Sequence, residues 1–211
     1  MLDQKTVRQF ISELGSDSPA PGGGSASALG ASLASALGAM VFSLTVGKKV
    51  YNEYSDENRK KINSGLQICI KNQNVFLELM NKDAEVFLSL MSAFKLPKES
   101  GDEIKIRSEK IKEGYQGALE IPLSVAEGAY KMYEYVKIAA ELGNKNVISD
   151  AGVSALMIQA SIESAILSVK INYSSIKDEI YKEKVKSRCN ELVKQGRINR
   201  DEILSVVNES L

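Results

Sequence analysis

The stretch "SPAPGGGSASALGASLASALGAMVFSLTVGKK", from Ser18 to Lys49, decides how this chain folds. It passes two prolines and three consecutive glycines, and then becomes a run of small and apolar residues. Small residues recur there at every fourth position, on one face of a helix: Ala26, Gly30, Ala34 and Gly38. A helix that is small or apolar all round is a buried helix. We therefore predict a buried central helix over Ser25–Val46.

A second segment matches this helix. Each glycine inside a helix costs about 1 kcal/mol relative to alanine, so the close approach of another backbone is the natural compensation. The segment Asp150–Tyr173 is equally rich in alanine, serine and glycine. We predict that the two helices cross through their small faces at the centre of the molecule.

The rest of the chain also has helical periodicity, and no alternating run typical of a strand occurs. Further helices are expected over Asp3–Leu14, Asp56–Phe94, Glu99–Gln116, from Pro122 to the "LGNKN" stop, over Lys177–Gln195 and from Asn199. Pro122 suits a first turn, and Ser149–Asp150 resembles an N-cap. The expected fold is an all-α, single-domain helical bundle over residues 1–211.

Composition excludes several classes of partner. Lysine plus arginine and aspartate plus glutamate both number 27, so the net charge is zero, and nucleic acid is not expected as a partner. The segment Ala26–Val46 has the length of a membrane span, but its alanines, serines and glycines predict no membrane insertion. Cys69 and Cys189 have no metal-binding spacing and are expected as structural thiols in a reducing cytoplasm.

Histidine is absent from the sequence. This excludes histidine bases, histidine nucleophile triads and histidine metal sites. We expect no metal, and acid–base chemistry is left to Asp, Glu, Lys, Tyr, Cys or water.

The glycines Gly22, Gly23 and Gly24 precede the central helix, and no core packing requires them. Three in a row leave backbone amides open and free to adopt positive φ. With Ser25 or Ser27 as the cap, they form a cradle for an anion or a carboxylate. No GK[ST] follows, so this is not a Walker loop. A tight turn is the alternative interpretation.

A carboxylate occupies an apolar position in the helix expected over Asp56–Phe94. The stripe Phe76, Met80, Asp83, Phe87, Leu90 and Phe94 advances in steps of three and four. A buried aspartate must be paired, hydrogen-bonded or neutralised, and burial raises its pKa toward the range useful for acid–base catalysis. The alternative is a structural aspartate that bonds a neighbouring helix.

Other polar residues break apolar stripes in the same way. Gln73 and Asn172 are expected to face inward and to form a polar pocket with Asp83, unless each is a solitary, satisfied core group. Lys48 and Lys49 end the central helix, where cations suit the helix dipole. Binding of a substrate carboxylate is the alternative role for these lysines.

Taken together, these stretches resemble the cyclodeaminase/cyclohydrolase family, whose domain is fused to a formiminotransferase in formiminotransferase-cyclodeaminase. The resemblance rests on "SPAPGGGSASAL", "MVFSLTVGKK", "DAEVFLSLMSAFKLPK", "IPLSVAE", "LGNKNVISDAGVSAL" and "VKIN", in order, over nearly the whole chain. The sequence departs from the family at Ser168, where asparagine is frequent in an "NVxIN" pattern.

The resemblance implies an all-α homodimer that acts on one-carbon tetrahydrofolates, with no cofactor beyond tetrahydrofolate as the substrate carrier. It places the catalytic aspartate at Asp83. It implies substrate contacts at Gly22–Gly24, Ser25, Lys48, Lys49, Ser149, Asp150 and Asn172. The expected activity is formiminotetrahydrofolate cyclodeaminase, which closes the 5,10-methenyl bridge with release of ammonia, a reaction of histidine degradation.

Two alternatives stay open. Methenyltetrahydrofolate cyclohydrolase would open the same bridge with water to give 10-formyltetrahydrofolate. A non-catalytic helical dimer that binds folate or a protein partner belongs to a different class, and Asp83 in an apolar stripe argues against it.

Overall fold

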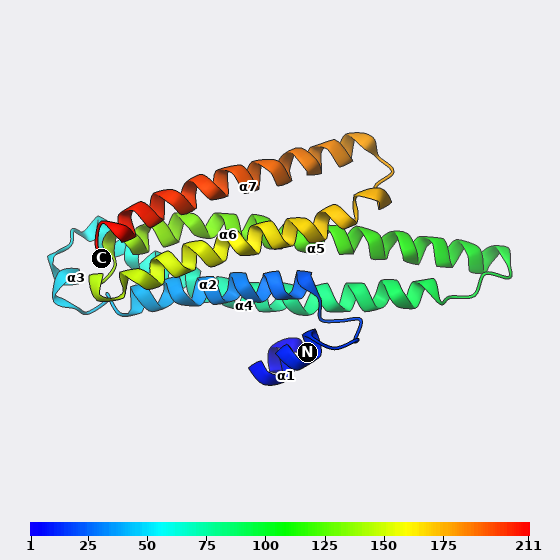
Figure 1. Cartoon of the computed structure of the whole chain (residues 1–211), viewed down its shortest axis with the longest axis horizontal. Coiled ribbons are helices and arrows are strands. Elements are labelled where there is room, and N and C mark those ends of the chain that lie inside the picture. Colours follow the sequence, from blue (N-terminus) through cyan, green and yellow to red (C-terminus); the bar gives the residue numbers. More distant parts are fainter.

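The central element of the structure is α2, Gly23–Ser43, which lies between the longer helices α4 and α6 (Figure 1). The computed structural model describes all residues, 1–211, and contains helices but no strands. The other helices are α1 (Val7–Leu14), α3 (Lys49–Glu53), α4 (Asp56–Phe94), α5 (Gly101–Leu142), α6 (Ile148–Ile171) and α7 (Glu179–Asn208). Three short 3₁₀ turns join them: η1 (Leu2–Gln4), η2 (Lys145–Val147) and η3 (Tyr173–Ser175). The prediction of an all-α bundle is confirmed.

Helices α2 and α6 cross through their small residues, as the sequence predicts. The Ser154 hydroxyl of α6 donates to the Ala34 carbonyl of α2 at 2.7 Å. A Cβ added to Gly30 would lie 2.7 Å from the Ser161 hydroxyl oxygen. Glycine and serine therefore allow the two backbones to approach more closely than larger side chains would.

Helix α2 is not buried on every side, which corrects one expectation. Leu33 and Met40 are 48% and 39% exposed. Both α2 and the segment Lys145–Ser175 are long and apolar enough to span a membrane, but 61% and 56% of their most apolar windows are buried within the bundle. Core helices of soluble proteins meet the same criterion.

Helix α5 continues through Pro122, where the sequence predicted a helix start. Proline has no N–H, so the carbonyl four residues earlier, at Ala118, loses its helical partner. The Asn172 side-chain amide at the end of α6 donates to this carbonyl at 3.0 Å. The carbonyl is thereby satisfied, and the helix continues. The expected break near Asn199 is also absent, because α7 is one helix.

Helices α4 and α5 contain 39 and 42 residues, against 21 in α2 and 24 in α6. Their excess length projects beyond the bundle as a two-helix hairpin (Figure 1). Helix α1 lies apart from the main body in the same view, and only its Phe10 is buried. The preceding turn is anchored by the Leu2 amide, which donates to the Asn81 side chain at 2.7 Å.

Candidate active site

The carboxylate of Asp83 lies against the first turn of α2. The Ser25 hydroxyl donates to Asp83 Oδ2 at 2.7 Å. A Cβ on Gly24 would overlap with the same carboxyl group. Glycine is therefore required at position 24 because the Asp83 carboxylate occupies the space of a side chain. Ser25 is fully buried and Asp83 is half-buried.

Burial raises the pKa of Asp83 above its ordinary value, while hydrogen bonds from the Ser25 side chain and backbone act in the opposite direction. The helix dipole also favours an anion at the α2 N-terminus. The net direction is upward. This is the direction that prepares a carboxyl group to accept and return a proton near neutral pH.

The glycine segment differs in detail from the prediction. Gly22 is the N-cap of α2 and the helix begins at Gly23, so neither Ser25 nor Ser27 is the cap. Positive φ occurs only at Gly47. A Cβ on Gly22 would meet nothing, and one on Gly23 would lie 3.9 Å from the Ser168 hydroxyl oxygen. The amides of the first helical turn have no hydrogen-bond partner within the helix. The N–H donors of the expected anion cradle are therefore present, but the expected positive φ angles are not.

Asn172 lies at the same end of the bundle, but its amide group is engaged in structure. It donates to Ala118 O at 3.0 Å and to Ser168 O at 2.9 Å. This bonding supplies the partner that Pro122 removes from α5. The sequence shows that the Ala118 carbonyl lacks a helical donor, because a proline follows four residues later. Only the fold shows which side chain replaces that donor. Substrate contact by Asn172 stays a prediction.

The remaining predicted site residues lie at the opposite end. Ser25 and Ser43 are 18 residues apart in α2, which corresponds to about 27 Å of helix. Lys48 and Lys49 follow that far end and are exposed. Ser149 and Asp150 lie in the first turn of α6 beside them, because Asn144 before that helix donates to Leu44 O at 3.0 Å. One chain therefore does not bring these four residues to Asp83.

The predicted N-cap at Ser149–Asp150 is wrong. The N-cap of α6 is Val147, without a side-chain bond, and the helix already includes both residues. The Asn144 side chain instead accepts from the Asn146 amide in the turn before the helix. The short η2 turn supplies the helix entry that a side-chain cap would otherwise provide.

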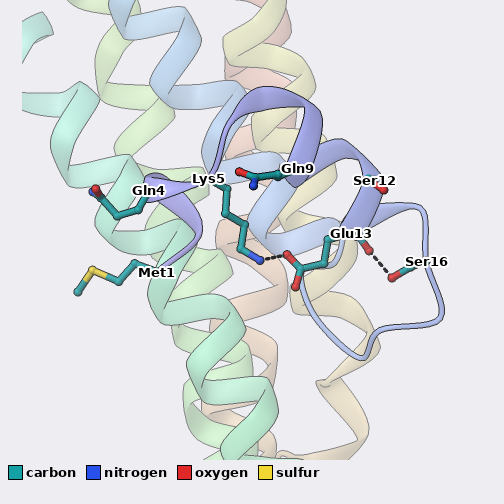
Figure 2. Close-up of a pocket in the computed structure, with 7 residues that line it drawn as sticks. All are labelled: Met1, Gln4, Lys5, Gln9, Ser12, Glu13 and Ser16. Carbon is teal, nitrogen blue, oxygen red and sulfur yellow. Dashed lines mark hydrogen bonds and ion pairs between the residues drawn. The ribbon is translucent and has the colours of Figure 1, made fainter.

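Two of the several surface hollows can be compared with the position of Asp83. A groove of about 420 Å³ runs between α2 and α6 and starts at Gly23 and Ser168. A mostly polar bay of about 500 Å³ lies in the N-terminal segment, crossed by the Lys5–Glu13 ion pair (Figure 2). That bay does not include Asp83. No three His, Cys, Asp or Glu side chains gather in a metal-binding arrangement.

A helical bundle that holds a half-buried carboxylate against a helix N-terminus defines a class of acid–base site built without histidine. Residues 6–191 match the family described as Formiminotransferase-cyclodeaminase. The chain belongs to this family. It is therefore a folate one-carbon enzyme of the cyclodeaminase/cyclohydrolase type, as the resemblance implied.

Individual relatives support this family assignment. The chain is 32% identical to "Methenyltetrahydrofolate cyclohydrolase" of Methylorubrum extorquens, over 94% of both proteins. It is 30% identical to "Formimidoyltransferase-cyclodeaminase" of Rattus norvegicus, covering 91% of this chain and 35% of that longer protein. The crystal structure of formiminotetrahydrofolate cyclodeaminase from Thermotoga maritima has the same fold, with a TM-score of 0.78, 22% identity and coverage of 100% and 98%.

Proposed function

We propose that this protein is a methenyltetrahydrofolate cyclohydrolase, which adds water to 5,10-methenyltetrahydrofolate and yields 10-formyltetrahydrofolate. The observation that carries the proposal is the Asp83 carboxyl group, half-buried and held by Ser25 at the α2 N-terminus. The relative that matches the chain over 94% of both lengths bears this activity in its name. The sequence alone favoured the cyclodeaminase and kept the cyclohydrolase as the alternative, so the preference is now reversed.

The proposed reaction needs one group that first accepts and then returns a proton. Asp83 takes a proton from water as the oxygen attacks the methenyl carbon, and a tetrahedral carbinolamine forms. The bond from this carbon to N5 then breaks, and Asp83 returns its proton to N5. The carbinolamine hydroxyl loses its proton to solvent as the formyl carbonyl forms on N10. Raised basicity of the carboxylate assists the first step, and the protonated acid assists the second.

The surroundings of Asp83 suit a folate. Phe87 lies one helical turn further along α4 than Asp83 and is 38% exposed. Its ring offers an apolar surface on which a flat heterocycle can pack. The amides of Gly23 and Gly24 lie in the first turn of α2, next to the carboxyl group, at a helix terminus that favours anions.

Formiminotetrahydrofolate cyclodeaminase is the second candidate. The 30% identity to the rat formimidoyltransferase-cyclodeaminase supports it. In that reaction N10 attacks the carbon of the protonated formimino group, Asp83 takes the N10 proton and passes it to the formimino nitrogen, and this nitrogen departs as ammonia. The site would be the same, with ammonia in place of water.

One experiment separates the two activities. The purified protein is given 5,10-methenyltetrahydrofolate and, in a separate cuvette, 5-formiminotetrahydrofolate, and the absorbance of the methenyl chromophore is followed. Loss of the chromophore in the first cuvette above the buffer rate supports the cyclohydrolase. Gain only in the second supports the cyclodeaminase. No change in either, with a folded protein, contradicts the proposed function.

A further inference from the structure

The two oxygens of the Asp83 carboxyl group have different surroundings. Oδ2 accepts a hydrogen bond from the Ser25 hydroxyl at 2.7 Å, and Ser25 is fully buried. The fully buried side-chain polar atoms that lack a hydrogen bond are Arg107 Nε and the Tyr173 hydroxyl oxygen. Asp83 Oδ1 accepts from no side chain and is not in this set, so it is open to solvent. One oxygen is thus tied to the protein, and the other is available to a ligand.

The first turn of α2 holds the carboxyl group in place. A Cβ on Gly24 would overlap with the carboxyl atoms, so the group lies against the backbone of this residue. The N-cap residue Gly22 has no side chain to cap the helix, and the carboxylate from α4 therefore lies where a capping side chain would otherwise meet the first amides. The Ser25 backbone also contributes a hydrogen bond to it.

No charged side chain sets the protonation of Asp83. The causes that act on its pKa are burial and the hydrogen bonds from Ser25. The first turn of α2 carries no charge, and Asp3 of η1 is bonded to the Asn81 amide at 2.9 Å. The other charged side chains at this end of the bundle are exposed: Lys82 and Glu85 on α4, Glu120 on α5 and Lys170 on α6. Ser25 is therefore the side chain that offsets the cost of burial.

We propose that Ser25 is a positioning residue for the catalytic carboxyl group: its hydroxyl fixes Oδ2 of Asp83, and Oδ1 exchanges the proton with the substrate. This inference rests on the proposed function. Oδ1 accepts a proton from the attacking water and returns it to N5 of the folate. Oδ2 is an acceptor both in the carboxylate and in the neutral acid protonated at Oδ1, so Ser25 can donate to it throughout. The carboxyl group then needs no rotation between the two steps.

The first test removes the hydroxyl and measures methenyl chromophore loss across substrate concentration and pH. In Ser25→Ala we expect kcat to fall about 10- to 100-fold, because a misplaced catalytic group costs this much, while KM changes little. The ascending limb of the pH–rate profile should move to higher pH, because the lost bond favoured the ionised form. Ser25→Cys fills nearly the same space with a weak donor and should behave in the same way.

Ser35→Ala is the matched control. Ser35 is also fully buried in α2, but its hydroxyl donates to Ala31 O at 2.9 Å, away from Asp83. This variant should keep the wild-type kcat and pH profile. Three results in a folded Ser25 variant would overturn the proposal: wild-type kcat, a loss confined to KM, or a fall in kcat with an unmoved pH limb.

The second test needs no turnover. Aspartate labelled with ¹³C at the carboxyl carbon is incorporated into the full chain, and the Asp83 signal is assigned by its absence from the Asp83→Asn variant. Its titration midpoint should be higher in Ser25→Ala and Ser25→Cys than in the wild type, and an unchanged midpoint would overturn the role of Ser25. A wild type that converts neither folate contradicts the proposed function, whereas this titration still decides whether Ser25 controls Asp83.

The third test addresses the two oxygens directly. In a crystal structure of Asp83→Asn with 10-formyltetrahydrofolate, the Ser25 hydroxyl should contact one terminal atom of the asparagine. The formyl carbon of the folate should lie nearest the other terminal atom, which occupies the position of Oδ1. A folate nearest the atom that contacts Ser25 would overturn the assignment of the oxygens.

Discussion

Replacement of Asp83 by asparagine is the most direct test of the catalytic assignment. Asparagine keeps the size of the side chain, and its carbonyl oxygen can still accept the Ser25 hydroxyl, which lies 2.7 Å from Asp83 Oδ2. It removes the ability to exchange a proton and, with it, the negative charge of the ionised form. Ser25 is the only side chain that hydrogen-bonds this carboxyl group, so no second acid–base side chain is bonded to it.

The expected loss is therefore the full value of a positioned acid–base group, about 10²- to 10⁴-fold in turnover, or roughly 2.7–5.5 kcal/mol of transition-state stabilisation. The measurement is the initial rate of methenyl chromophore loss across pH, with substrate affinity measured separately by fluorescence titration. Affinity should change little, and the pH–rate profile should lose the limb that reports Asp83. A folded variant that turns over within a few-fold of the wild type would refute the assignment.

The pH dependence of folding stability gives an independent test of the raised Asp83 pKa. Because the pKa of Asp83 is raised in the folded state, the folded protein binds this proton more tightly than the unfolded chain does. The ionised carboxylate then lowers stability at pH values above the raised pKa, and the penalty disappears as pH falls below the ordinary value. The asparagine variant should melt at or slightly above the wild-type temperature at neutral pH, and the difference should vanish in acid.

The remaining predictions concern packing and the glycine segment. Gly24→Ala should destabilise the fold by about 1–3 kcal/mol, because its Cβ overlaps with the Asp83 carboxyl group. Gly23→Val should instead weaken folate binding and leave the melting temperature nearly unchanged. Equal losses of melting temperature in the two variants would contradict this. Ala155→Leu, at a fully buried position in α6, should lower the melting temperature by about 2–12 °C, and an unchanged melt would show that the site has room. Burial raises the pKa of the Cys69 thiol to about 12, so a thiol reagent at pH 8 should label it only after unfolding; rapid labelling of the native protein would show that the core opens.

The sequence predicted the parts of the fold that depend on local patterns. Periodic small residues identified α2 and α6 as close partners, and the apolar stripe of α4 singled out Asp83. Pro122 misled the prediction, because its cost inside a helix depends on whether a distant group satisfies the freed carbonyl. Asn172 lies 54 residues from Ala118 in the chain, and no local pattern reports such a pair.

The candidate site was predictable only in part, for a geometric reason. Sequence motifs identify residues, but they do not show whether two motifs on different helices lie at the same end of the bundle. Gly24, Ser25 and Asp83 meet because α2 and α4 are antiparallel, and the same arrangement sends Lys48 and Lys49 about 27 Å away along α2. Helix α2 also begins at Gly23, before both serines that were expected as its cap, Ser25 and Ser27.

The bond between Asn172 and the Ala118 carbonyl has a consequence for how this protein can change over generations. Proline at position 122 is tolerable only while a donor reaches that carbonyl, and asparagine at position 172 has this task only while the proline is there. A lineage that loses Asn172 first leaves a carbonyl without its donor, at a cost of about 1–3 kcal/mol if that carbonyl is buried. A lineage that first replaces Pro122 by a residue with an N–H lets α5 satisfy itself and frees position 172 to vary. The order of the two replacements therefore decides whether the intermediate descendant carries this cost.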